Sequence, residues 1–360
     1  MSEQAPDLST LIDMQIRQAG PMSVATYMGL CLTHPRHGYY RRGGAIGASG
    51  DFTTASEISQ MFGEMIGFFL VNLWQQMGEP KAFTLLELGP GRGTLMADIL
   101  RVAARAPGFL DAVSIELFES DPALLAEQRT RLAAYNPAWI KDFALPADTP
   151  LLVVANEFFD ALPIRQFVRG RQGWHERMVG LFDGKRGFGL SPTPIPDGAL
   201  PEAVRDAPEG AVYEAGLAAG EVMKRLAPAV ARRGGAILAI DYGYAQTQTG
   251  ETLQAVRRHA YADPLEAPGD TDLSAHVDFG ALGEIARAAG LAVPPLATQG
   301  DFLKHLGIIA RAATLARANP SEAPAVNAAL DRLTAATQMG TLFKVFCAAS
   351  PGLSPEGFSS

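Results

Sequence analysis

The chain has 360 residues, a net charge of −8 at pH 7 and 48% hydrophobic residues, and its only cysteines are Cys31 and Cys347. This length suits one large α/β domain with insertions, or two domains. Two cysteines exclude a disulfide framework and a cysteine-rich metal site, and the acidic balance argues against broad surfaces for nucleic acid or anionic membranes.

The N-terminal residues 1–13 are polar and acidic, without the basic start of a signal peptide or the arginines of a transit peptide. The most apolar window, residues 65–74, is too short to span a bilayer. We therefore expect a bacterial, cytoplasmic protein without membrane insertion. A mitochondrial matrix location is expected only if a transit peptide is missing from this sequence.

Residues 1–80 are predicted to form a helical cap with a glycine-rich lid. Apolar residues recur at helical spacing from Leu8 to Ile16, and a second helix is predicted over residues 23–33. A long loop rich in glycine and aromatic residues follows, and such loops are usually functional or disordered. We expect Asp51 in this loop to contribute to a cofactor site, the alternative being that it caps the helix predicted over residues 57–77.

A strand, a tight turn and a helix are predicted between residues 83 and 100. The apolar run 83–86 is followed by Glu87 and by a turn containing Gly89, Gly91 and Gly93, and Thr94 begins a segment with helical periodicity. Glycines allow the backbone to approach a ligand closely, and a helix N-terminus offers free N–H groups.

The spacing of these glycines decides between ligands. They alternate, whereas the dinucleotide fingerprint places its third glycine three residues after the second, and the lysine of a phosphate loop is absent. Glu87 would repel a pyrophosphate and attract a cationic amino acid. The pattern resembles motif I of class I S-adenosylmethionine-dependent methyltransferases, which implies that cofactor; a glycine turn without a ligand is the alternative.

The α/β alternation continues with helix 94–105, strand 113–119, helix 122–134 and strands 139–143 and 151–155. This order predicts a Rossmann-like, doubly wound sheet whose ligands lie beyond the carboxyl ends of the strands. Glu119 ends the second strand, where its carboxylate can accept both ribose hydroxyls, and Asp142 ends the third, near the position expected for an adenine amino group. Either residue could instead cap the helix that follows.

The fourth strand leads into the sequence NEFFDALP, residues 156–163. Asn156, Glu157 and Asp160 are costly to bury without partners, so we consider them catalytic candidates. Glu157 is expected to hold the substrate nitrogen, with two phenylalanines excluding water. In the alternative, structural interpretation, Asn156 and Asp160 satisfy the backbone of the turn.

The methyltransferase domain is predicted over residues 81–350. Antiparallel hairpins at about 163–195 are expected on the open edge of the sheet, followed by helices at 214–232, 278–289 and 300–337 and strands at 236–241, 291–297 and 341–348. Residues 351–360 are expected to be a disordered tail. The histidines lack the spacing of a metal site, and Asp278 is expected to cap a helix; whether His259, His276 and Asp278 have a functional role is left open.

Four segments together resemble the MidA-type methyltransferases: residues 50–59, 87–93, 155–163 and 276–279. That family includes the mitochondrial complex I assembly factor that methylates an arginine. The resemblance covers about residues 8–348. It implies a class I methyltransferase fold, S-adenosylmethionine as cofactor, a protein arginine as substrate, and the complex I subunit beside the quinone site as the type of target.

The function expected from these features is methyl transfer to a side-chain nitrogen of a protein, most simply an arginine guanidinium. Such an in-line displacement requires positioning and exclusion of water, and carboxylates bind guanidinium in a planar fork. One alternative is an amide or exocyclic-amine N-methyltransferase, although both prolines of the Asn-Pro-Pro-Tyr loop are absent. Another is an assembly chaperone that binds S-adenosylmethionine without catalysis.

Overall fold

A computed structural model describes the structure of residues 6–41, 54–141, 148–257 and 260–358. Its largest sheet has eight strands. In spatial order they are β4 (Ala138–Ile140), β3 (Val113–Phe118), β2 (Phe83–Leu88), β5 (Leu151–Asn156), β10 (Gly235–Tyr244), β16 (Phe343–Ala349) and β15 (Ala297–Thr298), with β14 (Val277–Asp278) beside the end of β10. The strands from β4 to β10 are parallel, and β16 is antiparallel to both of its neighbours.

This strand order confirms the predicted doubly wound, mixed sheet. Every residue of β2 and β5 is buried, as expected for parallel strands that are covered on both faces. The strand order reverses between β2 and β5, and in open α/β sheets the ligand site lies at such a reversal.

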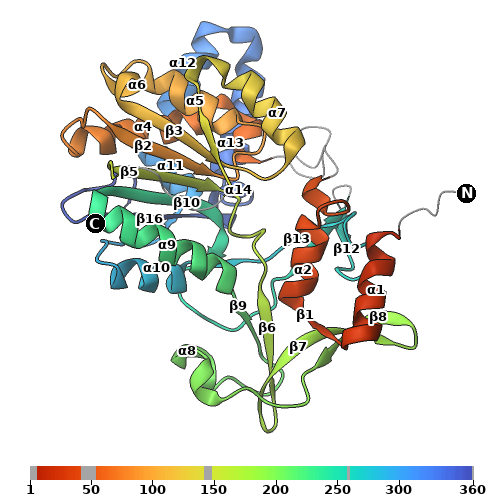
Figure 1. Ribbon diagram of the computed structural model, residues 1–360. Coiled ribbons are helices and arrows are strands. Elements are labelled where there is room, and N and C mark those ends of the chain that lie inside the picture. Colours follow the sequence, from red (N-terminus) through yellow and green to blue (C-terminus); the bar gives the residue numbers. More distant parts are fainter. Residues whose placement is uncertain (1–5, 42–53, 142–147, 258–259, 359–360) are drawn as a thin grey trace, which may run out of the picture.

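Helices cover both faces of the sheet (Figure 1). One face is covered by α4 (Gln60–Gln76), α5 (Thr94–Ala103), α6 (Phe109–Ala112), α11 (Gln299–His305), α12 (Ile308–Ala318) and α13 (Ala323–Thr334). The opposite face is covered by α9 (Leu217–Arg233) and α10 (Phe279–Ala288). The structure also contains the short helices α3 (Ala55–Ile58), α8 (Glu202–Arg205) and α14 (Met339–Leu342), and α7 (Pro122–Arg131) after β3.

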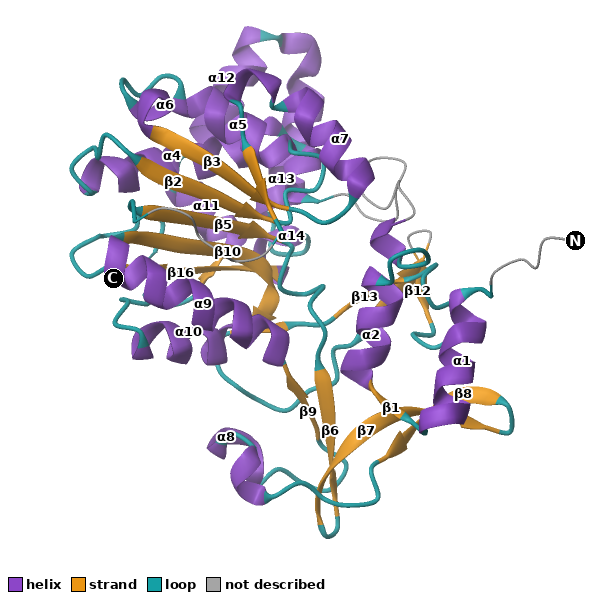
Figure 2. Cartoon of the chain, viewed as in Figure 1, coloured by secondary structure: helices purple, strands orange, loops and turns teal. Residues whose placement is uncertain are grey.

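A second group of elements lies beside the sheet (Figure 2). It contains α1 (Leu8–Ala19), β1 (Met22–Ser23), α2 (Val24–Thr33), the short 3₁₀ turn η1 (Tyr39–Arg41), β6 (Arg165–Gly170), β7 (Gly173–Phe182), β8 (Lys185–Leu190), β9 (Val212–Ala215), β11 (Gln254–Arg257), β12 (Ala260–Ala262) and β13 (Asp272–Ser274). The hairpins expected at 163–195 are present, but they do not extend the main sheet as predicted. They form a separate antiparallel sheet because β1 and β9 supply the neighbouring strands.

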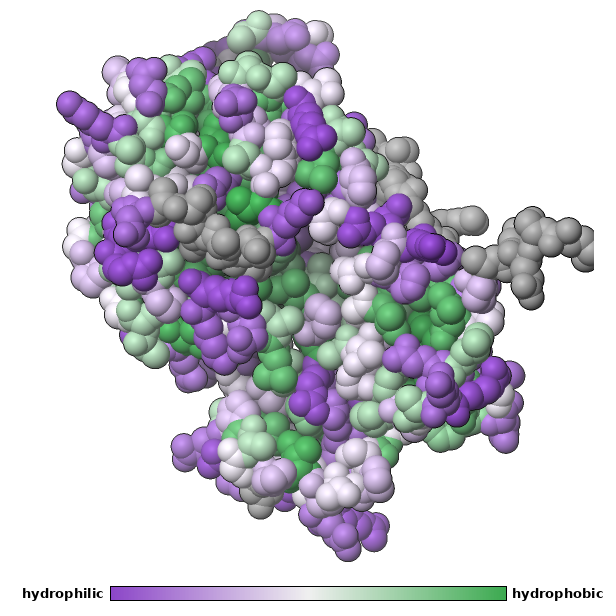
Figure 3. Space-filling view, in the orientation of Figure 1, coloured by the Kyte–Doolittle hydropathy of each residue, from purple (hydrophilic) through white to green (hydrophobic). Residues whose placement is uncertain are grey.

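The first two helices fill the core of this second group. Leu8, Ile12 and Ile16 of α1 and Met28 of α2 are buried together with Val179 of β7. Apolar residues of this region are also visible in the space-filling view, over α1 and α2 (Figure 3). By contrast, α4 packs against α5 in the layer that covers the sheet. The helices expected to form one cap over residues 1–80 therefore belong to two different parts of the structure.

Three further expectations for the C-terminal half of the chain need correction. The strand expected at 291–297 is reduced to β15 and an isolated bridge at Ala292, and the helix expected from 214 begins at Leu217 because β9 occupies the preceding residues. The prediction of a disordered tail is wrong for residues 351–358. Phe358 packs against Phe302, and the Ser354 amide donates a hydrogen bond of 2.8 Å to a side chain of α4.

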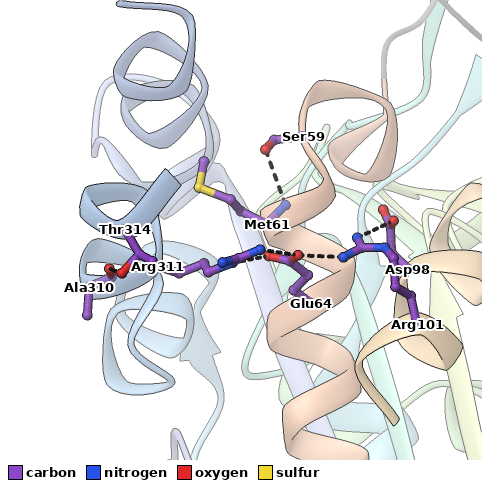
Figure 4. A network of polar contacts seen from close by, with 8 residues as sticks. All are labelled: Ser59, Met61, Glu64, Asp98, Arg101, Ala310, Arg311 and Thr314. Carbon is purple, nitrogen blue, oxygen red and sulfur yellow. Dashed lines mark hydrogen bonds and ion pairs between the residues drawn. The ribbon is translucent and has the colours of Figure 1, made fainter. Parts of the chain in front are cut away.

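A buried carboxylate joins three helices on one side of the sheet (Figure 4). Glu64 of α4 is 3% exposed and accepts hydrogen bonds from Arg101 of α5 at 2.7 Å and from Arg311 of α12 at 2.6 and 2.7 Å. Burial alone would raise the pKa of Glu64, but the two guanidinium groups lower it below its usual value. The ionised carboxylate therefore stabilises the packing of α12 on the sheet layer.

We expect Glu64→Gln to lower the free energy of unfolding by about 3 kcal/mol, the lower end of the range for breaking a buried ion pair, because both arginines are partly exposed. Urea unfolding measures this difference. The folded pKa is lowered, so the contribution is complete above the unfolded pKa and is lost as the pH falls through the folded value. Glu221→Gln, at the exposed pair with Lys224, should change stability by less than about 0.5 kcal/mol, and equal effects of the two variants would contradict the prediction.

Candidate cofactor and substrate site

A cavity of about 340 Å³ lies where the strand order of the main sheet reverses. Its wall is built by the glycine turn after β2, the end of β3, the loop after β5, the end of β10, and η1 and β13 from the second group of elements. A cavity of this volume falls within the range of small-molecule sites. A cavity is therefore present at the place where the site was expected, beyond the carboxyl ends of the strands.

The glycine turn brings backbone rather than side chains to this cavity. Gly89, Gly91 and Gly93 have φ angles of 62°, 53° and 77°, in the left-handed region that favours glycine, and the first two line the cavity. A Cβ atom on Gly89 would lie 3.0 Å from the ring of Phe158. Gly93 is the N-cap of α5, so the free N–H groups of that helix follow directly after the turn.

Glu87, two residues before Gly89, is a buried carboxylate without a described cation. It is 2% exposed, and among the residues that the structure describes its Oε2 has no hydrogen-bond partner. Burial, and then the negative charge of Glu119, raise the pKa of Glu87 to about 8. An orphaned carboxylate oxygen is costly to bury, so a cationic group of a ligand would stabilise this arrangement.

Glu119 follows the end of β3 and lines the same cavity. Its Oε1 accepts hydrogen bonds from the amides of Ser120 at 2.7 Å and Asp121 at 2.8 Å, which fix the orientation of the carboxylate. The alternative that Glu119 caps the next helix is not what the structure shows, because Asp121 is the N-cap of α7. The other two expected cofactor residues, Asp51 and Asp142, lie outside the described residues.

Gln128 of α7 connects the glycine turn with Glu119, and the sequence analysis did not single it out. Its buried side chain donates to the Gly91 carbonyl at 2.6 Å and to Glu119 Oε2 at 3.3 Å, and it accepts from the Trp139 indole at 2.8 Å. One amide therefore holds two parts of the cavity wall in register. An apolar replacement would leave partly buried polar groups of both parts without this partner.

We expect Gln128→Met to weaken the binding of S-adenosylhomocysteine about tenfold while leaving the protein folded, since each unpaired buried group costs about 1–3 kcal/mol and part of this cost falls on the free protein. Titration calorimetry measures the affinity. Gln75→Met, at an exposed position of α4, is the matched control and should bind with the affinity of the wild type. The same affinity in Gln128→Met would show that the amide does not position the wall.

The loop after β5 places two of the three catalytic candidates, Glu157 and Asp160, on the cavity wall, while Asn156 at the end of β5 is not among the described lining residues. Glu157 has a φ angle of 52°, lines the cavity and accepts hydrogen bonds at Oε1 from the Ala55 amide at 3.0 Å and from the Asn156 amide group at 3.2 Å. Burial raises the pKa of Glu157 to about 7. Asn156 Oδ1 is buried and has no partner among the described residues.

Asp160 also lines the cavity, and burial raises its pKa to about 7. Asp241 of β10 fixes the backbone of this loop. Its Oδ2 accepts hydrogen bonds from the amides of Phe159 at 2.9 Å and Asp160 at 3.1 Å. Asp241 is fully buried, and burial followed by the charge of Asp160 raises its pKa well above the usual value. Asp241 thus satisfies turn backbone, a role that the structural interpretation gave to Asn156 and Asp160.

Several residues of the cavity were missed by the sequence analysis. Tyr40 and Arg41 of η1 line it, and Tyr40 donates a hydrogen bond of 3.2 Å to Asp272 of β13 while Arg41 donates to the Ser120 carbonyl. Tyr242, at the end of β10, also lines it. The aromatic residues before the glycine-rich loop were a usable signal for Tyr40, whereas Asp272 stands in a short strand with no pattern of its own.

Comparison with known proteins identifies the class of enzyme to which the chain belongs. Residues 65–296 match the sequence model of a family described as "putative S-adenosyl-L-methionine-dependent methyltransferase". The chain belongs to this methyltransferase family. It is therefore an enzyme that uses S-adenosylmethionine, as the resemblance of the glycine turn implied.

Curated relatives cover most of the chain. A zebrafish (Danio rerio) protein named protein arginine methyltransferase NDUFAF7, mitochondrial, is 36% identical over 92% of this chain and 84% of its own length. The human (Homo sapiens) protein of the same name is 35% identical over 92% of this chain and 81% of its own length. Both names contain the word mitochondrial, which does not support the cytoplasmic location that we expected.

Solved structures agree with the fold. A Burkholderia thailandensis protein bound to S-adenosylhomocysteine superposes with a TM-score of 0.85 at 28% identity, covering 97% of this chain and 93% of that one. A native structure of a protein from the same organism superposes with a TM-score of 0.82 at 29% identity, covering 98% of this chain and 94% of that one.

In the part of the chain that the structure describes, none of the helices is long and apolar enough to cross a membrane.

The cavity fits the cofactor on its own chemistry. S-adenosylmethionine carries an ammonium and a sulfonium but no phosphate. Glu119, which lines the cavity and is fixed by backbone amides, suits paired ribose hydroxyls. Glu87 is not among the described lining residues, but its orphaned oxygen, two residues before Gly89, has the charge that suits the ammonium. The glycine turn leaves room for close approach at Gly89, where a Cβ would already touch Phe158.

Proposed function

We propose that this enzyme methylates a nitrogen of an arginine side chain in a protein. The observation that carries the proposal is the pair of carboxylates, the half-buried Glu157 and the buried Asp160, on the wall of the cavity that the glycine turn also lines. Carboxylates bind guanidinium through two parallel hydrogen bonds, and the curated relatives are named protein arginine methyltransferases.

In the proposed reaction, S-adenosylmethionine supplies the methyl group and leaves as S-adenosylhomocysteine. Glu157 orients the guanidinium, and the Phe158 ring on the same wall excludes water, so that the nitrogen is aligned for in-line transfer. The nitrogen that gains the methyl group loses a proton. A carboxylate with a pKa of about 7 can hold that proton at Glu157.

We propose the following contacts with the cofactor. Glu87 faces the ammonium and Glu119 the ribose, while Gly89, Gly91 and Gly93 let the backbone approach. Asp51 and Asp142 keep their predicted roles, as part of the lid and as partner of the adenine. Asn156 is proposed to act through Glu157, to which it donates a hydrogen bond.

For the target, we propose a subunit of respiratory complex I, the type that the resemblance of residues 155–163 implies. The bacterial cytoplasm stays our prediction for the location. Methylation of an amide or exocyclic amine, and binding of the cofactor by a chaperone without catalysis, are the competing functions that an experiment has to separate.

Transfer of a labelled methyl group separates these functions. The purified enzyme, methyl-labelled S-adenosylmethionine and a lysate of cells that lack this protein are incubated, and the labelled products are mapped by mass spectrometry. We expect label on arginine of a protein. Label on an amide or on nucleic acid would favour the second N-methyltransferase function, and cofactor binding without any label would favour the chaperone.

A further inference from the structure

A second cavity, of about 160 Å³, lies between α9, α10 and residues 275–278. It adjoins the first cavity, because Leu162 lines both. Drug-sized ligands occupy about 300–1,000 Å³, whereas a cavity of about 150 Å³ admits a molecule the size of benzene. The second cavity therefore has room for about one side chain.

The polar group that distinguishes this cavity is Asp278, which is 8% exposed. Its Oδ1 accepts the amide of Ala281 at 2.9 Å and so caps α10, as the sequence predicted. Its Oδ2 is buried and, within the described ranges of the chain, has no hydrogen-bond partner. A helix cap needs only one of these oxygens, so the cap leaves the second oxygen unsatisfied.

The charges around Asp278 favour a cation. Glu214 on the same wall is buried, and its oxygens accept hydrogen bonds from Gln166 and Thr252. Burial lowers the pKa of His276, which leaves the imidazole neutral at pH 7. Lys224, the cation among the lining residues, is exposed at the rim and paired with Glu221.

The remaining wall is apolar. Phe159, Leu282 and Ile285 line the interior, and Leu217 at the rim is 55% exposed. An apolar wall with a carboxylate suits an alkyl chain that ends in a cation, the chemistry of lysine and arginine.

We propose that the second cavity receives a lysine or arginine side chain of the protein substrate, close to the arginine that enters the first cavity. This inference rests on the proposed function. The two cavities share one wall: Ser274 lines the first and Ala275 the second, and the Ala275 amide donates a hydrogen bond of 3.0 Å to the Asp160 carbonyl. A substrate segment that crosses this wall can place one basic side chain in each cavity.

The first test measures whether a cation binds in the second cavity, without any methyl transfer. The protein is titrated with n-butylguanidinium, with n-butylammonium and with 1-butanol as the uncharged control, and the amide NMR shifts of residues 276–285 are followed. We expect saturable shifts with a cation and none with butanol. Asp278→Asn keeps a capping side chain but removes the charge, so the affinity should fall at least tenfold. Asp7→Asn, at the N-cap of α1, removes a charge from another cap and should bind like the wild type.

Absence of saturable shifts with both cations, or equal shifts with butanol, would overturn the proposal. This outcome is independent of whether the protein methylates arginine. A failure of the proposed function would appear instead as absence of methyl transfer while the cations still bind at the second cavity.

The second test identifies the source of the cation. A peptide library with one fixed arginine and randomised neighbours is bound to the enzyme in the presence of S-adenosylhomocysteine, and the bound peptides are sequenced. We expect lysine or arginine to be enriched at a set distance from the fixed residue. The ratio of lysine or arginine at that position in the bound peptides to its frequency in the library should fall towards one for Asp278→Asn. The ratio should stay at the wild-type value for Asp7→Asn. Equal enrichment in both variants, or none at all in the wild type, would reject a substrate side chain as the occupant, and binding of the small cations alone would then assign the cavity to a free cation.

Discussion

Gly91→Val should abolish the binding of S-adenosylmethionine and of S-adenosylhomocysteine. Gly91 lines the cavity with a φ angle of 53°, a conformation in which a β-branched residue is strained by roughly 1–3 kcal/mol. The valine side chain would also enter the space that the cofactor needs. In addition, the carbonyl of Gly91 accepts the 2.6 Å hydrogen bond from Gln128, so a shift of the turn would disturb the wall around Glu119.

Titration calorimetry and thermal unfolding measure the two consequences separately. Gly184→Val is the matched control: Gly184 connects β7 and β8, has a φ angle of 78°, and a Cβ atom there would meet nothing within 4 Å. Both variants carry backbone strain, but only Gly91→Val should lose the cofactor. If Gly91→Val bound the cofactor with normal affinity, the glycine turn would not be part of the cofactor site. If NAD competed with the cofactor in the wild type, the ligand class inferred from the glycine spacing would be wrong.

The part of the site that lies on regular α/β elements could be predicted from the sequence. The run 83–86 and the glycines after it define a strand and a turn by themselves, and Glu119 follows because parallel strands end at one edge of the sheet. The same rule placed Glu157 at that edge. In each case the position of a side chain depends on local sequence and on the order of strands, both of which can be read directly.

The residues that were missed reach the site through long-range packing. Asp241 holds the amides of Phe159 and Asp160 across more than 80 positions of sequence, and Tyr40 meets Asp272 across 232. Gln128 resembles any polar residue of an amphipathic helix until its three partners are known. Neither periodicity nor residue spacing in the sequence predicts such contacts, because they depend on how separate elements pack against one another.

The errors in the fold have a related cause. The hairpins at 163–195 were placed on the main sheet because their neighbours β1 and β9 have two and four residues, too few to show strand alternation. The last residues were taken as disordered because they lie at the end of the chain, where residues are often poorly ordered. The segment is nevertheless ordered, because Phe358 packs against Phe302 and the Ser354 amide donates a hydrogen bond to Gln76 of α4.

We expect Glu157→Gln to reduce methyl transfer by about one to two decades while leaving the affinity for S-adenosylhomocysteine nearly unchanged. A hydrogen bond to an ionised partner contributes about 1.5–3 kcal/mol, which corresponds to that loss of rate if it acts in the transition state. The variant keeps an oxygen for the Ala55 amide, which donates to Glu157 at 3.0 Å. The charge is therefore removed with little change in the shape of the loop.

The pH profile adds a second readout for the same residue. The pKa of Glu157 is raised to about 7, so the ionised form that binds a guanidinium becomes more populated as the pH rises. In the wild type, transfer should increase between about pH 6 and 8, and Glu157→Gln should lose most of this increase. Asp160, whose pKa is also raised to about 7, accounts for what remains.

Asp160→Asn is the matched comparison, because Asp160 lines the same cavity and its backbone amide is already held by Asp241. We expect a smaller loss of rate than in Glu157→Gln, since Glu157 is the residue proposed to hold the substrate nitrogen. Loss of cofactor affinity in Glu157→Gln would move the residue to the cofactor site. Full transfer activity in that variant would show that Glu157 does not hold the substrate, and a larger loss in Asp160→Asn would transfer the role to Asp160.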